Sequence, residues 1–343
     1  MAIAVDAMGG DRAPAEIVAG AVEAVRQLRI PLFLIGPQQQ VQDELDRLRF
    51  RDSLITVVDA PEWIGMEESP GVAVRRKRDS SIARATALVE SGQAEAVVSA
   101  GNSGAAMAEA MLKLGTLPGV ERPAIATLFP SHRGKVVVLD VGANVDCKPR
   151  HLLQFARMGA VYAHRVLGVE NPRVGLLSIG EEPSKGNELT KEAHKLIGNS
   201  DLYFIGNLEG KDLFSGVADV AVCDGFVGNI VLKVTEGVAE MFTTILKREL
   251  TRHRVYMLGQ FLLKGAWQGF RRQLDYAEYG GALLLGVKGV CVICHGRSNA
   301  KAVMSAIRVA QESVQHQAVN AIAASIQAAE PAPVAAAEKS SAT

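Results

Sequence analysis

The chain has little of what marks several classes of protein. Its 343 residues carry 37 basic and 37 acidic side chains, so no overall charge attracts nucleic acid. No apolar run reaches the roughly 18 residues of a membrane-spanning helix. Asp6 and Asp11 interrupt any secretory leader at the N-terminus. We therefore expect a cytoplasmic protein in a reducing compartment, with no nucleic-acid partner.

Cysteine is scarce, and its four positions do not predict a metal site. Only Cys291 and Cys294 have the spacing of a metal or redox pair, and Cys147 and Cys223 stand apart. The pair falls in an apolar run that predicts a buried strand. Side chains alternate along a strand, so the two thiols should lie on opposite faces of the sheet. We predict core residues here and no bound metal.

The common catalytic fingerprints are missing as well. The sequence has no G-x-G-x-x-G dinucleotide motif, no G-x-x-x-x-G-K-[ST] phosphate loop and no G-x-S-x-G nucleophile elbow. Ser99, Ser103 and Cys223 have no histidine close by in sequence. The sequence therefore predicts an anion-binding site without a cofactor, a metal or a protein nucleophile.

Apolar runs alternate with helical patterns along most of the chain. Most of the runs are continuous in Val, Ile and Leu, as in parallel strands buried on both faces. This predicts an α/β layered fold with a mostly parallel sheet, in one domain over residues 1–328. A helical segment is expected at 229–272, one last helix from Ser298 to about Gln327, and a disordered tail at 329–343. The predicted strands are Ile3–Ala7, Leu32–Gly36, Leu54–Val58, Ala96–Ala100, Ala124–Phe129, Val136–Val141, Val174–Ile179, Tyr203–Gly206, Val217–Cys223 and Val290–His295.

Small and polar residues follow many of these strands. The first strand ends in Asp6, then Gly9, Gly10 and Asp11. Ligands of parallel sheets bind outside the carboxyl ends of the strands, and open backbone N–H groups suit an anion. We expect these turns to lie together at one end of the sheet. The other turns are 99–105, 140–146, 179–187, 223–229 and 295–299.

Taken together, these turns resemble the bacterial phosphate acyltransferase family over about residues 1–315. The motifs are Asp6-Ala7-Met8-Gly9-Gly10-Asp11, Gly101-Asn102-Ser103-Gly104, Asp140-Val141-Gly142-Ala143-Asn144, Gly180-Glu181-Glu182 with Lys185-Gly186, Cys223-Asp224-Gly225-Phe226 with Gly228-Asn229, Ala277-Glu278-Tyr279-Gly280-Gly281, and His295-Gly296 with Ser298-Asn299.

The resemblance implies an α/β/α sandwich related to phosphotransacetylases and to the isocitrate/isopropylmalate dehydrogenase group. It implies transfer of a fatty acyl group from acyl carrier protein to inorganic phosphate, for phospholipid synthesis. A homodimer, peripheral contact with the membrane and a downstream membrane glycerol-3-phosphate acyltransferase are implied as partners.

Phosphate is already a nucleophile, so such an enzyme must hold it near the thioester and stabilise the oxyanion. We predict that Lys185 and the loop Gly101, Asn102, Ser103 and Gly104 hold phosphate. Asn229 is predicted to donate to the oxyanion, and His295 to protonate the leaving sulfur. The remaining predicted binding residues are Asp6, Gly9, Gly10, Asp11, Asn144 and Asp224. Of these, the three aspartates are predicted to orient lysine, amides and turns, and the two glycines to allow close approach of the backbone.

Two further segments suggest partner surfaces. Arg75, Arg76, Lys77 and Arg78 form a basic run that would attract an acidic carrier protein. Residues 256–272 form a basic amphipathic pattern that packs in a core, packs in a dimer or lies in a membrane interface. The resemblance favours the membrane interface, with dimer packing by 229–250. The membrane-facing candidates are Leu258, Leu262, Leu263, Trp267 and Phe270.

Three other functions remain open at this point. A phosphotransacetylase using a small acyl-CoA would share the phosphate attack. An NAD-dependent decarboxylating dehydrogenase would need a metal and nucleotide signature that the sequence lacks. A membrane-docked protein without catalytic activity is the third.

Overall fold

The computed structural model describes residues 1–252, 265 and 280–329. Its strands form an 11-stranded sheet in the order β3-β2-β1-β4-β11-β10-β5-β6-β9-β7-β8. The strands are β1 Ile3–Asp6, β2 Leu32–Gly36, β3 Ile55–Asp59, β4 Ala96–Ser99, β5 Ala124–Ser131, β6 Gly134–Leu139, β7 Val174–Leu177, β8 Phe204–Leu208, β9 Val220–Val222, β10 Ala282–Leu285 and β11 Val290–Ile293.

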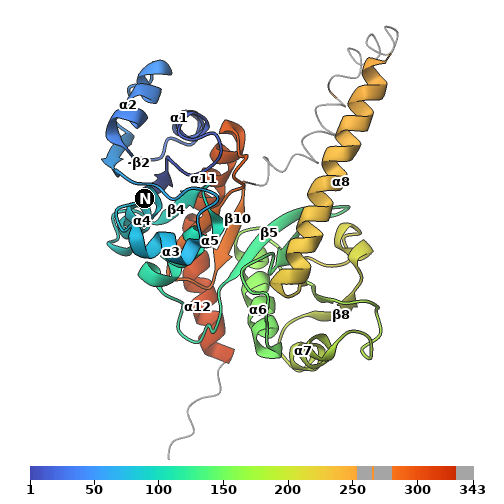
Figure 1. Cartoon of the computed structure of the whole chain (residues 1–343). Coiled ribbons are helices and arrows are strands. Elements are labelled where there is room, and N and C mark those ends of the chain that lie inside the picture. The colour runs from blue at the N-terminus through green and yellow to red at the C-terminus, as the bar shows by residue number, and fades with distance from the viewer. Residues whose placement is uncertain (253–264, 266–279, 330–343) are drawn as a thin grey trace, which may run out of the picture.

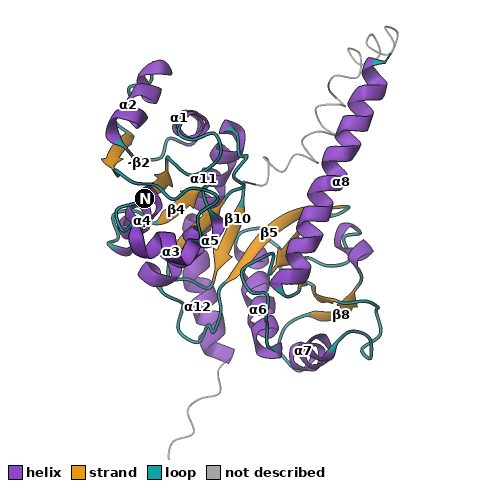
Figure 2. Cartoon of the chain, in the orientation of Figure 1, coloured by secondary structure: helices purple, strands orange, loops and turns teal. Residues whose placement is uncertain are grey.

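The sheet consists of two parallel halves that run in opposite directions. The first half holds β3, β2, β1, β4 and β11, and the second holds β6, β9, β7 and β8. Between them, β10 and β5 pair antiparallel with each other and with the flanking strands β11 and β6. Figure 2 shows these strands crossing from one half of the molecule to the other. The expectation that all the strand-end turns share one end of the sheet is therefore wrong.

Helices cover both faces of the sheet, so the predicted three-layer α/β/α arrangement is confirmed. Cores on the two faces contain alternate residues of β1: Ile3 and Val5 pack on one, Ala4 on the other. The face of Ile3 is covered by α1 Ala15–Leu28, α2 Gln38–Arg47, α6 Pro149–Arg165, α7 Glu188–Gly198, α11 Ala300–Gln315 and α12 Ala318–Ala329. The opposite face is covered by α3 Pro70–Arg76, α4 Ser81–Glu90, α5 Ser103–Glu109 with the π-helix η1 Ala110–Leu114, the 3-10 helix η2 Gly210–Phe214, and α8 Gly225–Thr251.

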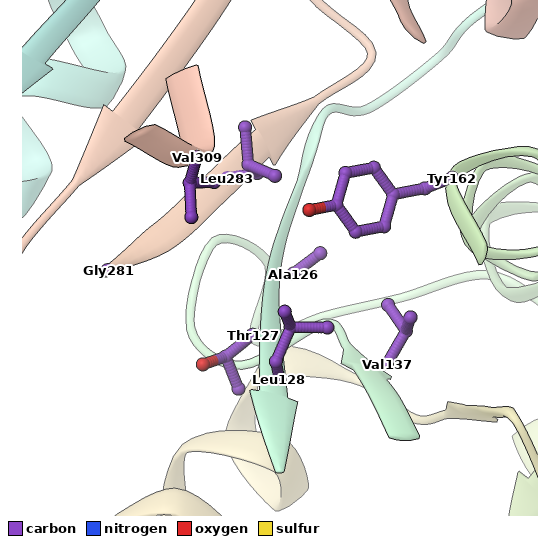
Figure 3. A pocket seen from close by; sticks show the side chains of 8 residues that line it. All are labelled: Ala126, Thr127, Leu128, Val137, Tyr162, Gly281, Leu283 and Val309. Carbon is purple, nitrogen blue, oxygen red and sulfur yellow. The ribbon is translucent and has the colours of Figure 1, made fainter. Parts of the chain in front are cut away.

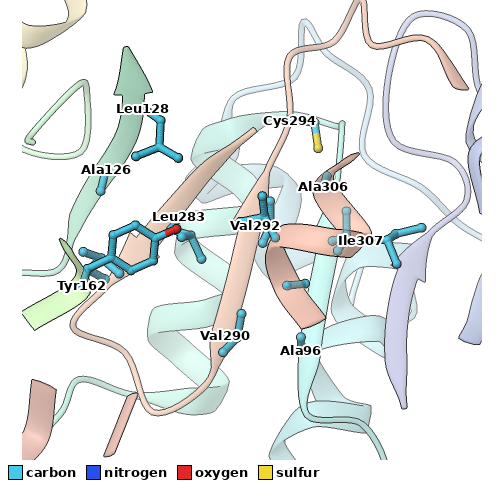
Figure 4. Packing of buried hydrophobic residues seen from close by; sticks show 14 of the residues in the cluster. Ala96, Ala126, Leu128, Tyr162, Leu283, Val290, Val292, Cys294, Ala306 and Ile307 are labelled. Carbon is cyan, nitrogen blue, oxygen red and sulfur yellow. The ribbon is translucent and has the colours of Figure 1, made fainter. Parts of the chain in front are cut away.

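The larger core lies under α6 and α11, where β10 and β5 join the halves (Figure 4). Tyr162 of α6 is 2% exposed and its ring reaches Ala126 and Leu283. Burial raises the pKa of its hydroxyl above the usual range. A cavity of about 10 Å³ remains beside it (Figure 3), room for no more than a water molecule. The junction between the halves is thus a packed core.

Most predicted elements lie within a few residues of the observed ones. The 124–141 hairpin is confirmed, and its strands close at the pair Ser131 and Gly134. The predicted last helix is wrong in one respect: it breaks into α11 and α12 at Gln317, whose φ is 51°. The short strand β10 and the helix α3 were absent from the pattern-based predictions. Cys291 and Cys294 are both buried and lie in different cores, as alternation predicts.

Helix α8 projects away from the body of the molecule (Figure 1). Only Gly225 and Gly228 are buried along its 27 residues. Across the described ranges, no helix is long and apolar enough to span a membrane. The residues predicted to face the membrane, Leu258, Leu262, Leu263, Trp267 and Phe270, lie outside the described residues. So does the predicted tail at 329–343 beyond Ala329, which is the last residue of α12.

Candidate active site

A buried aspartate organises the turns after β1 and β4. Asp6 is 3% exposed and accepts hydrogen bonds from Ser99 Oγ at 2.7 Å and from Met8 N–H at 3.2 Å. Ser99 Oγ in turn accepts from Gly101 N–H at 3.1 Å. Burial raises the pKa of Asp6, and the bonds from hydroxyls and backbone amides oppose that shift. The carboxylate thus fixes the 101–104 loop through Ser99.

The two glycines of the first turn are required by close contacts. A Cβ on Gly9 would lie 2.6 Å from Gly101 N and 2.7 Å from Asp6 Oδ2. Gly10 has a φ of +113°, which L side chains rarely adopt. Asp11 N–H then donates to Gly296 O at 2.8 Å. The turns after β1, β4 and β11 therefore form one continuous surface of backbone.

The side-chain amide of Asn102 bonds to the protein at both ends. Its Oδ1 accepts from Ala105 N–H at 3.1 Å and caps α5. Its Nδ2 donates to Met66 O at 3.1 Å and to Glu68 O at 2.9 Å. Both ends of this amide are occupied, so its observed role is to tie the 65–68 turn to α5. Ser103 remains exposed beside it.

A second buried aspartate organises the end of β6. Asp140 has no exposed surface, and its two oxygens accept five hydrogen bonds. Burial raises its pKa, and the donated bonds oppose the shift. Asn144 supplies two of the bonds, through N–H at 2.7 Å and Nδ2 at 2.9 Å. Asn144 is therefore also committed inside the fold.

The start of α8 sits directly on this second turn. Asp224 Oδ1 accepts from Val227 N–H at 2.9 Å, so Asp224 is the N-cap of the helix. A Cβ on Gly228 would collide with the carbonyl oxygen of Asp140. Asn229 is exposed and lies over Gly142, 3.8 Å from the place of a Cβ there. Its amide faces the turn without taking part in the hydrogen bonds of Asp140.

The strands that lead into the two turns bury residues on the same side of the sheet. Asp6 lies two residues beyond Ala4, and Asp140 two beyond Val138, and both of those residues pack on the face covered by α3, α4, α5 and α8. Ile125 of β5 packs against the cores at both places. The two halves thus share apolar packing at Ile125 on one face of the sheet, although their strands point in opposite directions.

His295 is where the halves come into polar contact. Its Nδ1 accepts from Arg297 N–H at 3.2 Å, and its Nε2 lies 3.4 Å from Lys233 Nζ of α8. Burial lowers the pKa of His295, and so do the charges of Lys233 and Arg297, while Glu236 and Asp11 oppose them. The ring is therefore predominantly neutral near pH 7.

Lys185 lies in the turn after β7 and, in the described part of the chain, is not hydrogen-bonded to the turns of Asp6 and Asp140. Its side chain is exposed, and its backbone N–H donates to Glu182 O at 2.9 Å. Its stem lies beside Gly180. Within the described part of the chain, no ion pair or hydrogen bond joins it to another predicted site residue.

The four basic residues at the C-terminal end of α3 differ in their exposure and contacts. Arg75, Arg76 and Arg78 are exposed. Lys77 instead lies 2.6 Å from Glu68 Oε1 and donates to Trp63 O at 2.9 Å. Its charge is already paired, and only the three arginines present free-standing charge to a partner.

Two hollows in the described part of the fold lie away from these turns. A groove of about 380 Å³ runs between α6 and α12, past His164 and Arg165. It belongs to the helical layer on the opposite face from Asp6 and Asp140. We therefore define the candidate site by the side chains and turns around Asp6, Asp140 and His295, and not by this groove.

Sequence reasoning missed Ser99, Glu68 and Lys233 as parts of the site. Lys233 is four residues beyond Asn229, so the two side chains share one face of a helix. The spacing of four residues in a predicted helix could therefore have identified Lys233 as a neighbour of Asn229 from the sequence. Glu68 had none, because its role depends on contacts with Lys77 and Asn102 from other segments.

The arrangement of elements is that of the phosphotransacetylases. A phosphotransacetylase from Streptococcus pyogenes matches with a TM-score of 0.62 and 17% identity, covering 93% of this chain and 94% of that one. The EutD phosphotransacetylase from Staphylococcus aureus matches with a TM-score of 0.61 and 16% identity, with the same coverage. At this identity the likeness establishes the fold.

The chain belongs to the family described as "Fatty acid synthesis protein", which matches residues 1–321. Phosphate acyltransferase from Pelotomaculum thermopropionicum is 53% identical over 330 residues, covering 96% of each chain. Phosphate acyltransferase from Geobacter sulfurreducens is 53% identical over 315 residues, covering 92% of this chain and 91% of that protein. The family suggested by the strand-end motifs is confirmed.

Proposed function

We propose that this protein transfers a long-chain fatty acyl group from acyl carrier protein to inorganic phosphate. The observation that carries the proposal is the near full-length identity with enzymes named phosphate acyltransferase. The acyl phosphate formed would enter phospholipid synthesis, through a membrane glycerol-3-phosphate acyltransferase. The protein acts as a homodimer at the cytoplasmic surface of the membrane.

The reaction proceeds by direct attack. A phosphate oxygen bonds to the thioester carbonyl carbon, the C–S bond breaks, and the leaving thiolate takes up a proton. Two thiols near the second turn are poor nucleophiles, since burial raises the pKa of Cys147 to about 12 and that of Cys223 well above its usual value. This favours phosphate itself as the nucleophile.

The predicted residues divide into contacts with substrate and supports. Asn229, exposed over Gly142, donates to the oxyanion. The minor imidazolium form of His295 gives its proton to the leaving sulfur and returns to the neutral ring. Backbone of the Gly9–Gly10 and Gly101–Gly104 turns, with the Ser103 hydroxyl, lines the phosphate side. Asp6, Asn102, Asn144 and Asp224 hold the turns in place.

The first experiment is an assay with two acyl donors. Purified protein is incubated with phosphate and either palmitoyl carrier protein or acetyl-CoA, and acyl phosphate is trapped with hydroxylamine. We expect product from the palmitoyl carrier protein alone. Product from acetyl-CoA alone would favour a phosphotransacetylase, and no product from either would contradict the proposal.

The site assignment is tested by Asn229→Ala and His295→Gln. Loss of a donor to a developing oxyanion lowers kcat by about 100-fold or more. Full activity in both variants, with unchanged thermal unfolding, would contradict these roles. Glu188→Gln, at the exposed start of α7, is the matched control.

A further inference from the structure

An exposed methionine lies against the backbone surface formed by the turns after β1 and β11. Met66 belongs to the connection between β3 and α3 and is 38% exposed. Its Cε lies 2.6 Å from the place that a Cβ on Gly296 would occupy. The two carboxylate oxygens of Asp11 lie 3.2 and 3.4 Å from the same place. Met66 thus reaches from a distant segment onto the candidate site, with part of its side chain open to solvent.

The backbone around Met66 is held in place by polar side chains. Glu68 Oε1 accepts hydrogen bonds from Gly65 N–H at 2.7 Å and from Lys77 Nζ at 2.6 Å. Asn102 Nδ2 donates to Met66 O at 3.1 Å and to Glu68 O at 2.9 Å. These bonds fix the backbone of Met66 relative to the loop before α5. A methionine side chain has three rotatable bonds and adapts to its neighbours, so its free end can follow the shape of a ligand.

The surroundings of Met66 suit an apolar ligand better than an anion. Its thioether offers no hydrogen-bond donor, and the carboxylate of Asp11 repels a phosphate at this point. An apolar group that covers Met66 removes apolar surface from water, which is favourable in proportion to the area buried. The contact point is therefore distinct in character from the backbone turns that line the phosphate side.

The proposed reaction brings an apolar chain to this point. Phosphate must lie within bonding reach of the thioester carbonyl, and the acyl chain begins at that carbonyl. The turn that carries Gly10 adjoins both neighbours, since a Cβ on Gly10 would lie 3.1 Å from Gly296 O and 3.2 Å from Ala100 O. The Met66 contact at Gly296 is therefore next to the turns proposed for phosphate. A chain that starts at the carbonyl meets Met66 within its first few carbons.

We propose that Met66 contacts the acyl chain close to the thioester and favours long chains over short ones. This inference rests on the proposed function, because it concerns the acyl donor of that reaction. Met66 makes and breaks no covalent bond. It covers methylene groups of the bound chain, and the gain increases with the number of methylene groups covered. An acetyl group therefore gains less from Met66 than a palmitoyl chain does.

The kinetic test compares Met66→Ala with Met66→Leu on palmitoyl and acetyl carrier protein, the latter at raised enzyme concentration. Burial of one methylene group changes affinity about fourfold. We therefore expect Met66→Ala to lower kcat/KM about 5- to 50-fold for the palmitoyl donor and less than about threefold for the acetyl donor. Met66→Leu should keep most of the activity. Met111→Ala, at a methionine of η1 that is 37% exposed, is the matched control.

Equal losses with the two donors in Met66→Ala would overturn the inference, because they would indicate a contact with the carrier protein or a general disturbance. A loss below threefold with the palmitoyl donor would overturn it as well.

A second variant tests the contact by displacing the methionine. Gly296→Ala places a Cβ 2.6 Å from Met66 Cε, so the free end of that side chain has to move. We expect kcat/KM for palmitoyl carrier protein to fall about 3- to 10-fold, and the same substitution to have a much smaller effect in Met66→Ala, where the displaced atom is gone. Losses that simply multiply in the double variant would contradict the contact.

Direct binding separates this inference from the proposed function. The methionine methyl groups are isotope-labelled for NMR, and the signal of Met66 is the one lost in Met66→Leu. Decyl phosphate, kept below its critical micelle concentration, should shift this signal, whereas inorganic phosphate should not. The signal of Met111 should stay in place with both.

No shift of the Met66 signal, or equal shifts with decyl and inorganic phosphate, would overturn the inference even if acyl phosphate is made. A shift with decyl phosphate alone, in a protein that makes no acyl phosphate, would support the apolar contact and contradict the proposed function.

Discussion

Ser99 Oγ donates a 2.7 Å hydrogen bond to Asp6 Oδ2 across 93 positions of the chain. The bond joins the ends of β1 and β4, and Ser99 passes its constraint on to Gly101. Both side chains are 3% exposed. A single hydroxyl thus couples the first turn of the chain to the loop predicted to line the phosphate side.

Removing the Ser99 hydroxyl should lower the stability of the fold. Ser99→Ala leaves the buried Asp6 carboxylate short of a donor, and we expect the free energy of unfolding to fall by about 1–3 kcal/mol. Urea denaturation measures the change. Ser91→Ala, at an exposed serine, should alter it by less than about 0.5 kcal/mol. Equal effects of the two variants would contradict this account of Asp6.

Gly9→Ala should disturb the site more than the fold. The added Cβ would meet the backbone of Gly101 and the side chains of Asp6 and Ser99 at 2.6–2.9 Å. We expect kcat/KM for phosphate to fall at least 10-fold, and steady-state kinetics would show it. Gly237→Ala on α8 meets nothing within 4 Å, so it should keep full activity and gain up to about 1 kcal/mol of stability. Normal kinetics in Gly9→Ala would contradict the close approach.

The sequence predicted the layers of this fold and most of its strands, because continuous Val, Ile and Leu runs such as 136–139 are strong local signals. It did not predict that Asp6 and Asp140 end strands of opposite direction, because direction depends on which distant strands pair. β10, four residues long, depends on its neighbours β5 and β11. At the site, the motif residues were found, but Asn102 and Asn144 were expected to face a ligand. Their amides bind the protein instead.

Docking of acyl carrier protein on the basic residues at the end of α3 stays a prediction. It involves Arg75, Arg76 and Arg78, because Lys77 is paired with Glu68. Arg75→Glu with Arg76→Glu should lower kcat/KM for acyl carrier protein substrates at low salt, because opposite charges accelerate association. Added salt should lower the rate of the unaltered protein and affect the variant little. Reversal of Arg51 and Lys191, both exposed elsewhere, is the control. The same salt dependence in both proteins would count against α3.

An apolar stripe on α8 favours contact with a second copy of this chain. Val227, Ile230, Val234, Val238, Met241 and Ile245 recur every three or four residues and are 37–59% exposed. Such spacing forms the seam between paired helices. Val234→Glu with Met241→Glu should convert the dimer to a monomer in sedimentation equilibrium. Glu240→Lys with Lys247→Glu, on other positions of α8, should leave it dimeric. A monomer before any substitution would refute the seam.

The position of β11 between β4 and β10 has a consequence for synthesis of the chain. β1 to β4 leave the ribosome early, but the strand that covers the open edge of β4 comes after the whole second half. An unpaired strand edge is a template for association with other chains. The second half, from β6 to β9, is continuous in sequence and has no such delay. A chain that stops after α8 would therefore carry two uncovered strand edges, at β4 and at β5, and both are templates for aggregation.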